Sequence, residues 1–240
     1  MTTKQPNRIT QSLLLPAQFV LLLWAIHLVQ TLLHLDLGVY GVFPRNLIGL
    51  RGVIFSPLLH SNWAHLFANT PPLFFLSAMI LFFYRRVAIP AFIMIYLLTG
   101  LAVWGFGRGV FHIGASGVVY GLVAFVFWNG IFRRNLKSIA LALIVVFYYG
   151  SMFMGILPGQ EGISWESHLL GGLAGIFTAY WFRDRIERDE EKKVYSWENE
   201  PEQPPQTFLD PDIFEKTKTE RQKDAEPDED LPGWFSNRTW

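Results

Sequence analysis

Long runs of apolar residues, separated by short polar segments, dominate the chain up to residue 183. A helix that rises 1.5 Å per residue needs about 20 apolar residues to cross roughly 30 Å of hydrocarbon. Six stretches fit this length, namely residues 12–34, 64–84, 87–106, 115–132, 137–156 and 165–182. Several of them carry polar residues, which are costly in lipid and should face the protein interior. The pattern predicts an all-α integral membrane protein with six transmembrane helices.

The segments outside these spans are of two kinds. Residues 36–62 are too long for a tight loop and too apolar for a free one, and their Gly, Pro and aromatic content predicts a structured first loop lying partly in the interface. Beyond residue 184 the chain is acidic, carries prolines and is poor in aliphatic residues, which predicts disorder. We therefore expect a membrane domain over residues 1–183 and a cytoplasmic acidic tail over residues 184–240.

Charge divides the chain at the same place. Residues 1–183 hold eleven Lys/Arg and three acids, a net of +8, whereas residues 184–240 hold nine Lys/Arg and seventeen acids, a net of −8. Lys and Arg of short loops stay on the cytoplasmic side of a membrane. One side of the predicted spans carries Lys4, Arg8, Arg85, Arg86, Arg133, Arg134, Lys137, Arg183 and Arg185, and the other carries Arg45, Arg51 and Arg108. This predicts that both termini are cytoplasmic, and the short, single-core chain without a targeting presequence suits a bacterial inner membrane.

Several kinds of chemistry are excluded. The chain has no cysteine, which removes disulfides, thiolate metal ligands and cysteine nucleophiles. It has no H-E-x-x-H or similar ligand set, so we expect no metal site and no metalloprotease. We also expect no cofactor and no nucleic-acid partner.

Three polar sets lie near the predicted outer ends of the spans: His65 with Asn69 in the second span, Ser116 with Tyr120 in the fourth, and His168 with Gly171 and Gly175 in the sixth. In the first two sets the residues are four apart and so share one face of a helix. The assignment of inner and outer ends did not use these residues. Their agreement is therefore independent support for a common site.

Serine hydrolysis needs an activated hydroxyl, a base and donors for an oxyanion. Ser116 begins a span, where backbone N–H groups are unpaired and can point at a developing negative charge. Gly114 and Gly117 would let a substrate backbone approach closely. His168 is the best candidate base, because the G-x-x-x-G face after it allows its helix to lie close against another. If that other helix is the fourth span, His168 meets Ser116.

Two further groups fit around this pair. His65 and Asn69 would supply oxyanion donors from a third direction. Tyr120, one turn below Ser116, could pack on His168 or hydrogen-bond to it and so fix its ring. The remaining histidines are interpreted as interfacial or structural and are given no chemistry: His27, His34, His60 and His112.

Other interpretations remain open from the residues alone. A serine between glycines and a G-x-x-x-G face are each more often packing features, and a purely structural membrane protein would lose nothing with the Ser116 hydroxyl. A small transporter could use His65, Asn69 and His168 as an ion path. It would not explain why a serine flanked by glycines is needed.

Taken together, the motifs resemble those of rhomboid intramembrane serine proteases over residues 12–183. The resemblance lies in a G-x-S-G motif at residues 114–117, a histidine followed by two glycines at His168, Gly171 and Gly175, and an H-x-x-x-N motif at His65 and Asn69. It implies a rhomboid-like six-helix bundle with Ser116 as nucleophile and His168 as base, a dyad without an aspartate. It also implies an oxyanion hole made by His65, Asn69 and the backbone at Ser116.

The resemblance further implies an endopeptidase that works through an acyl-enzyme. Family members cut transmembrane segments of other proteins near the outer face, so the implied partners are such segments and membrane lipid. A helical peptide hides its carbonyls in hydrogen bonds, so the substrate must unwind before attack. The alternative within the family is a catalytically inactive protein that binds client helices. Such proteins typically lack the serine or the histidine, and this chain keeps both.

The chain departs from the family pattern in three places. The alanine that usually precedes the base is Ser167, and the nearest counterpart of a Trp-Arg pair in the first loop is Leu50 with Arg51. Pro71 and Pro72 come two and three residues after Asn69 and lack the N–H groups that a helix would use. We therefore expect a bend in the second span just below Asn69.

Overall fold

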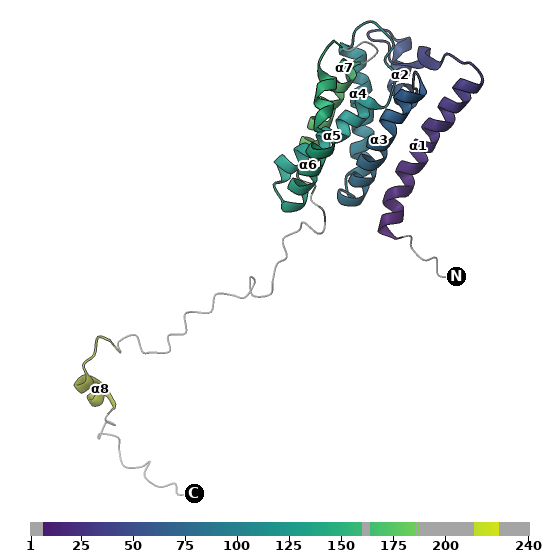
Figure 1. Cartoon of the computed structure of the whole chain (residues 1–240). Helices are drawn as coiled ribbons and strands as arrows, with labels where there is room; N and C mark the ends of the chain where they lie inside the picture. Colours follow the sequence, from purple (N-terminus) through teal and green to yellow (C-terminus); the bar gives the residue numbers. More distant parts are fainter. Residues whose placement is uncertain (1–6, 160–163, 186, 188–213, 226–240) are drawn as a thin grey trace, which may run out of the picture. The chain divides into compact units, whose positions relative to one another are not determined.

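The computed structural model describes residues 7–159, 164–185, 187 and 214–225 (Figure 1). Contacts divide the chain into a first unit, Met1–Glu191, and a second unit, Lys192–Trp240, which are treated separately below. The first unit is a helical bundle built from α1 (Arg8–Leu32), α3 (Trp63–Phe83), α4 (Ala88–Phe106), α5 (Ser116–Arg133), α6 (Leu136–Tyr149) and α7 (Trp165–Trp181). A 3₁₀ segment, η4 (Gly150–Ile156), continues α6. The predicted all-α fold is confirmed.

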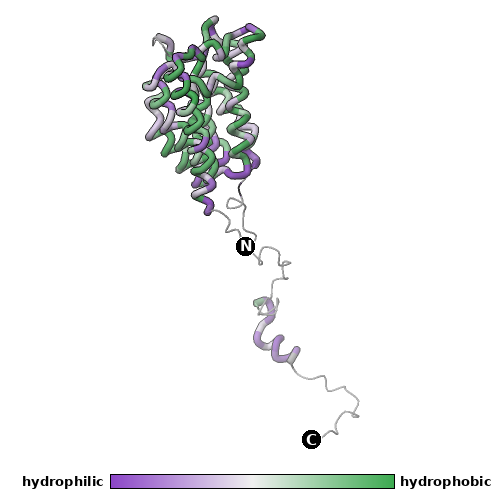
Figure 2. Tube along the Cα trace, turned by 90° about the vertical axis from the view of Figure 1, so that its right-hand side faces the viewer, coloured by the Kyte–Doolittle hydropathy of each residue, from purple (hydrophilic) through white to green (hydrophobic). Residues whose placement is uncertain are grey.

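The bundle has the dimensions and surface of a membrane domain. Among the described residues, five helical segments are long and apolar enough to span a bilayer: Arg8–Leu32, Trp63–Phe83, Ala88–Phe106, Ser116–Arg133 and Leu136–Ile156. The sixth predicted span, α7, has 17 residues, or about 26 Å of helix. Large apolar side chains such as Leu21, Phe147 and Trp181 are more than half exposed, and hydrophobic residues make up most of the helices of the bundle (Figure 2). This surface suits contact with lipid chains and not with water.

Helix α5 is the centre of the bundle. It packs against α7, α6, α3 and α4. Of its residues, 56% are buried, against 17% of the residues in the most apolar stretch of the segment formed by α6 and η4. Its side chains Leu122 and Phe125 are fully buried in one cluster with Leu66 and Leu73 of α3. A helix that is apolar on all sides is expected at such a position.

Glycines bring α5 and α7 into close contact. A Cβ added at Gly171 would lie 2.0 Å from the carbonyl oxygen of Gly117, and one added at Gly175 would lie 2.1 Å from that of Gly121. The two helices can approach this closely only because neither carries side chains along this line, which we call the glycine seam (Gly117, Gly121, Gly171 and Gly175). The close approach predicted from the G-x-x-x-G face of the last span is thereby confirmed, with α5 as the partner.

The first loop is structured, as its composition predicts. It contains η1 (Leu37–Tyr40), η2 (Ile48–Arg51), the short helix α2 (Gly52–Phe55) and η3 (Ser56–Leu58). Arg51 donates a hydrogen bond of 2.9 Å to the Val39 carbonyl, and its guanidinium lies 4.6 Å from the centre of the Tyr40 ring. Arg51 thus acts within the first loop and stabilises its fold.

Both prolines of the second predicted span lie inside α3, which continues to Phe83. Just before them, Thr70 donates a hydrogen bond of 2.8 Å to the Leu66 carbonyl and accepts one of 3.1 Å from the Trp24 indole of α1. These bonds tie α1 to α3 at the level of the prolines. The bend below Asn69 stays a prediction.

In the second unit the structure describes helix α8 (Lys218–Ala225), whose side chains from Lys218 to Asp224 are exposed. Thr217 and Glu220 form a capping box, in which the Glu220 carboxylate accepts from the Thr217 N–H at 2.7 Å. This short helix lies inside the segment predicted to be disordered. Residues 184, 185, 187 and 214–217 of that segment are also described, and its remaining residues lie outside the described ranges.

Candidate active site

Ser116 and His168 are brought together at the end of the bundle where α5 and α7 begin, here called the dyad end. Ser116 Oγ lies 2.9 Å from His168 Nε2. Ser116 is the first residue of α5 and His168 lies in the first turn of α7, so the glycine seam that starts at Gly117 sets their separation. His168 is 8% exposed. The contact predicted from sequence between these two residues is present.

A backbone carbonyl fixes the tautomer of His168. Its Nδ1 lies 2.8 Å from the carbonyl oxygen of Gly155 in η4. A carbonyl oxygen only accepts hydrogen bonds, so Nδ1 carries the proton in the neutral ring and Nε2 has a lone pair. That lone pair faces the Ser116 hydroxyl and can accept its proton. The ring is thus oriented as a general base requires, without a carboxylate.

Tyr120 holds the plane of the His168 ring. The two rings stack with their centres 4.1 Å apart and their planes 9° from parallel. The Tyr120 hydroxyl donates a hydrogen bond of 2.6 Å to the carbonyl of Met152, also in η4. A Cβ at Gly155 would lie 2.1 Å from the Tyr120 hydroxyl oxygen, so only glycine fits where η4 passes over both rings.

His65 and Asn69 line the same cavity as the dyad, from α3. His65 is placed by its own N–H, which donates to the Asn62 side chain at 2.8 Å, and by Ser61 Oγ, which lies 3.3 Å from Nδ1. The Asn69 amide donates to the His65 carbonyl at 2.9 Å, which leaves its second N–H for another acceptor. Both side chains therefore share a cavity with Ser116 and His168, and their role as oxyanion donors stays a prediction.

Gly114 is required by two separate features. Its φ is +114°, in the region that favours glycine. A Cβ there would also lie 2.6 Å from Cε1 of His65. The imidazole of His65 therefore lies directly against the backbone that leads to Ser116.

The first turn of α5 offers unpaired donors beside the hydroxyl. Ala115 precedes the helix without a side-chain cap, and the hydrogen bond from the Val119 N–H to the Ala115 carbonyl, 3.0 Å long, begins the helical series. The N–H groups of Ser116, Gly117 and Val118 come before it. Together with the positive end of the helix dipole, they provide a place for a negative oxygen.

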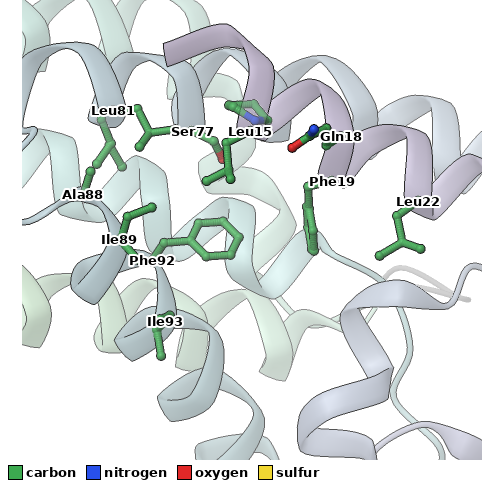
Figure 3. A pocket seen from close by; sticks show the side chains of 12 residues that line it. Leu15, Gln18, Phe19, Leu22, Ser77, Leu81, Ala88, Ile89, Phe92 and Ile93 are labelled. Atoms are coloured by element: carbon green, nitrogen blue, oxygen red, sulfur yellow. The ribbon is translucent and has the colours of Figure 1, made fainter. Parts of the chain in front are cut away.

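The cavity at the dyad end has a volume of about 800 Å³. Its polar wall is formed by a set of side chains that includes Ser61, Asn62, His65, Asn69, Arg108, His112, Ser116, Tyr120, Ser164 and His168. A second hollow, of about 390 Å³, lies between α1, α3 and α4, where Phe19 faces Phe92 (Figure 3). Its lining is almost wholly apolar, and it contains none of the dyad residues, so the chemistry belongs to the first cavity.

Four groups at the site were missed or undervalued from sequence. The carbonyl of Gly155 has no sequence signal, because any residue supplies one. His112, interpreted as structural, is 2% exposed and lines the cavity. Ser56 of the first loop donates a hydrogen bond of 2.8 Å to the His112 carbonyl. Ser167 was noted from sequence only as a departure from alanine. Its hydroxyl oxygen lies 2.7 Å from the hydroxyl oxygen of Ser164.

Charge near the site is balanced. Arg108 and Glu166 form an ion pair with 3.2 Å between Nε and Oε1.

Burial lowers the pKa of His60, in the first loop, to about 3, and the nearby His65 acts in the same direction. Burial also lowers the pKa of His112. These two loop histidines are therefore neutral at neutral pH. Among the described residues, no group of three or more His, Asp or Glu is placed to hold a metal ion.

Comparison with known proteins shows which family the chain belongs to. A profile of the Rhomboid domain matches residues 49–185. A protein of Mycobacterium tuberculosis and one of Mycobacterium bovis are each 39% identical to this chain over 188 residues, which are 75% of this chain and 78% of theirs. A protein of Mycobacterium leprae is 34% identical over 171 residues, 68% of each chain. All three are described only as uncharacterized.

The fold, the site and the profile match define a multi-pass integral membrane protein of rhomboid type. The chain belongs to the rhomboid family.

Proposed function

We propose that this protein is an intramembrane serine endopeptidase that cuts transmembrane segments of other proteins near the outer face of the membrane. The observation that carries the proposal is the hydrogen bond of 2.9 Å between Ser116 Oγ and the lone pair of His168 Nε2 at the wall of a polar cavity. Members of this family that lack activity exist, and the mycobacterial relatives do not decide between the two. The chemistry of the dyad favours activity.

In the first half of the reaction, Ser116 Oγ attacks the scissile carbonyl carbon while its proton passes to His168 Nε2. The negative charge on the carbonyl oxygen is held by the Ser116 N–H and by the side chains of His65 and Asn69. The C–N bond then breaks, and the proton moves from Nε2 to the departing amine. Ser116 is left as an ester of the substrate's new carboxyl end.

In the second half, water replaces the amine. A water molecule gives a proton to His168 Nε2 and attacks the ester carbonyl. The C–O bond to Ser116 breaks, the acid product leaves, and the proton on Nε2 returns to Ser116 Oγ. The Gly155 carbonyl keeps Nδ1 protonated throughout, because it can only accept a hydrogen bond from it.

The cavity suits an unwound peptide. Its lining comes from α3 on one side and from Met152 of η4 on another. Helix α3 packs on α1, α4 and α5, whereas α6 packs on α5 and η4. We propose that a transmembrane segment reaches the dyad from lipid between α3 and α6. Because a helix hides its carbonyls, segments with helix-weakening residues near their outer ends should be preferred.

We also propose that the dyad end faces outward from a bacterial inner membrane, with both termini in the cytoplasm. The opposite end of the bundle carries Arg8, Arg85, Arg86, Arg133 and Arg134, which the positive-inside rule places in the cytoplasm. A reporter that fluoresces only in the cytoplasm, fused after the last residue, should be bright. A second fusion at the same position carries a phosphatase that is active only in the periplasm. A dark fluorescent fusion together with an active phosphatase fusion would contradict this orientation.

The test of the activity uses the purified full chain in detergent with a generic single-span substrate that carries small and helix-weakening residues at its outer end. Wild type should cut it, and Ser116→Ala should not. The matched control is Ser77→Ala, which removes a buried hydroxyl of α3 that lines the apolar hollow away from the dyad. A fluorophosphonate probe should label wild type and Ser77→Ala alone.

The possible outcomes separate the alternatives. Labelling without cleavage would mean that the substrate was unsuitable. Neither labelling nor cleavage by wild type would point to an inactive relative that binds client helices. Equal cleavage by wild type and Ser116→Ala would exclude the proposed nucleophile.

A further inference from the structure

His112 occupies a fixed position between the two helices of the dyad. It lies in the loop 107–115 between α4 and α5, four residues before Ser116. Its backbone pairs with Val42 of the first loop in both directions, at 2.9 and 3.0 Å, and its carbonyl accepts from Ser56 Oγ at 2.8 Å. With 2% exposure, the residue is held by the first loop and is part of the cavity wall.

The two ring nitrogens of His112 have different partners. Nε2 lies 3.0 Å from the carbonyl oxygen of Arg108, and Nδ1 lies 2.6 Å from the hydroxyl oxygen of Ser164. Because the Arg108 carbonyl only accepts, Nε2 carries the proton of the neutral ring. Nδ1 then accepts from the Ser164 hydroxyl. Burial lowers the pKa of His112, which keeps this neutral form at neutral pH.

Ser164 passes this constraint on to α7. It is the N-cap residue of α7, and its side chain accepts from the Ser167 N–H at 3.4 Å. Its hydroxyl oxygen also lies 2.7 Å from that of Ser167. Since the Ser164 proton is directed to His112, the Ser167 hydroxyl is the donor in this pair. The hydrogen bonds therefore run in one direction, from Ser167 through Ser164 to His112.

We propose that His112 is a positioning residue for the dyad, which sets the place of His168 through Ser164 and Ser167. The chain of hydrogen bonds joins the loop that leads into Ser116 to the residue directly before His168. The glycine seam fixes how closely α5 and α7 approach, but not how far α7 is turned or shifted along its axis. The His112 chain fixes that second quantity. No hydrogen bond or ring contact joins His112 to Ser116 or His168 in the described structure, so it does not act as the base.

The inference rests on the proposed peptidase function, and three substitutions test it. His112→Asn places an amide oxygen near the position of Nδ1 and keeps an acceptor for Ser164. His112→Gln places its amide near Nε2, where it can donate to Arg108 but does not reach Ser164. His112→Phe fills the space and makes neither bond. All three remove the imidazole, so the comparison isolates the bond to Ser164.

The measurement is kcat and KM for the single-span substrate, with kcat divided by the number of sites that the fluorophosphonate labels. His112→Phe and His112→Gln should lower kcat per labelled site by about 10- to 100-fold with little change in KM, as expected for a misplaced base. For His112→Asn, kcat per labelled site should stay within about threefold of the wild-type value, because this variant keeps the hydrogen bond from Ser164. Ser164→Ala should also lower kcat, and adding it to His112→Phe should have little further effect.

A merely structural role gives a different pattern. The number of labelled sites and the unfolding temperature would fall while kcat per labelled site stayed constant in all three variants. That result, or activity of His112→Gln equal to or above that of His112→Asn, would overturn the inference. Additive losses in the double variant would do the same.

A second measurement does not need turnover. In protein carrying ¹⁵N-histidine, His112 should give the spectrum of the Nε2–H tautomer and His168 that of the Nδ1–H tautomer. His112→Phe should shift the His168 signals, whereas His112→Asn should leave them near their wild-type positions. If wild type is neither active nor labelled, the proposed function fails, and these spectra still decide the inference. Unmoved His168 signals in His112→Phe would overturn it.

Discussion

At Gly171, α7 lies directly against the backbone of α5, and alanine there should separate the dyad. The added Cβ would lie 2.0 Å from the carbonyl oxygen of Gly117. Carbon–oxygen contacts ordinarily need about 3.3–3.6 Å, so the helices would have to move apart locally by more than about 1 Å. Ser116 directly precedes Gly117, and His168 lies one turn before Gly171. The movement therefore acts on their hydrogen bond of 2.9 Å.

The expected result follows from this displacement. A shift of about 1 Å from the productive geometry can cost on the order of 10²-fold in rate, so Gly171→Ala should lower kcat by about that factor. KM should change little, because the cavity walls on α3 are not touched. The unfolding temperature in detergent should fall as well, since the substitution opens the close contact between α5 and α7.

The neighbouring residue supplies the control. A Cβ at Gly172 would meet nothing within 4 Å. Both substitutions replace glycine by alanine inside the same helix, and both gain about 0.5–1 kcal/mol of helix propensity. Only their contacts differ. Cleavage of the single-span substrate by the two variants, at matched amounts of folded protein, is the assay. Equal kcat for Gly171→Ala and Gly172→Ala would refute the argument that the glycine seam positions the dyad.

Three further predictions concern the residues around the dyad. Asn69→Ala should lower kcat by about 10²- to 10³-fold without abolishing it, because oxyanion donors act in parallel; complete loss, or no loss, in the cleavage assay would contradict this role. Tyr120→Phe keeps the stacked ring and loses one hydrogen bond to Met152, worth about 1 kcal/mol, so kcat should fall by less than about tenfold; a loss as large as that of Ser116→Ala would be inconsistent with it. The third concerns His60, whose pKa is lowered to about 3 in the folded protein. The unfolded chain binds a proton there near pH 6.5, so stability should fall as the pH drops from about 6.5 toward 3, by roughly 4 kcal/mol at most. His60→Phe should remove that part of the pH dependence of thermal unfolding, and an unchanged dependence would count against it.

Much of the fold follows from the sequence because lipid imposes a simple rule. Each span needs a minimum apolar length, so the six helices could be predicted from hydropathy alone. The contact between Ser116 and His168 could also be predicted. Gly171 and Gly175 permit a close helix pair, and the resemblance to the rhomboid family implied that the other helix is the one that begins at Ser116. Packing of small residues leaves a pattern in the sequence that can be read without coordinates.

The remaining parts of the site leave no such pattern. The Gly155 carbonyl that orients His168 is a backbone group, and nothing in the sequence of η4 marks it as an acceptor. His112 gave no signal because its partners, Ser164 and Arg108, come from another helix and from its own loop. Their meeting depends on the turn of α7 relative to α5, which is a tertiary property. The predicted spans 87–106 and 115–132 leave His112 between them, as the structure does, but sequence reasoning had no means to find its neighbours.

The carbonyl of Gly155 has a consequence for how the protein can be built and how fast it can work. A carboxylate in its place would stabilise the protonated base more strongly, but a buried negative charge near the membrane interior carries a large desolvation cost. A neutral dipole avoids that cost and still selects the correct tautomer. In the proposed reaction, the imidazolium formed in each turnover would have no counter-ion at Nδ1. For the proposed peptidase we therefore expect selectivity at the expense of speed, since only segments that stay unwound long enough would be cut.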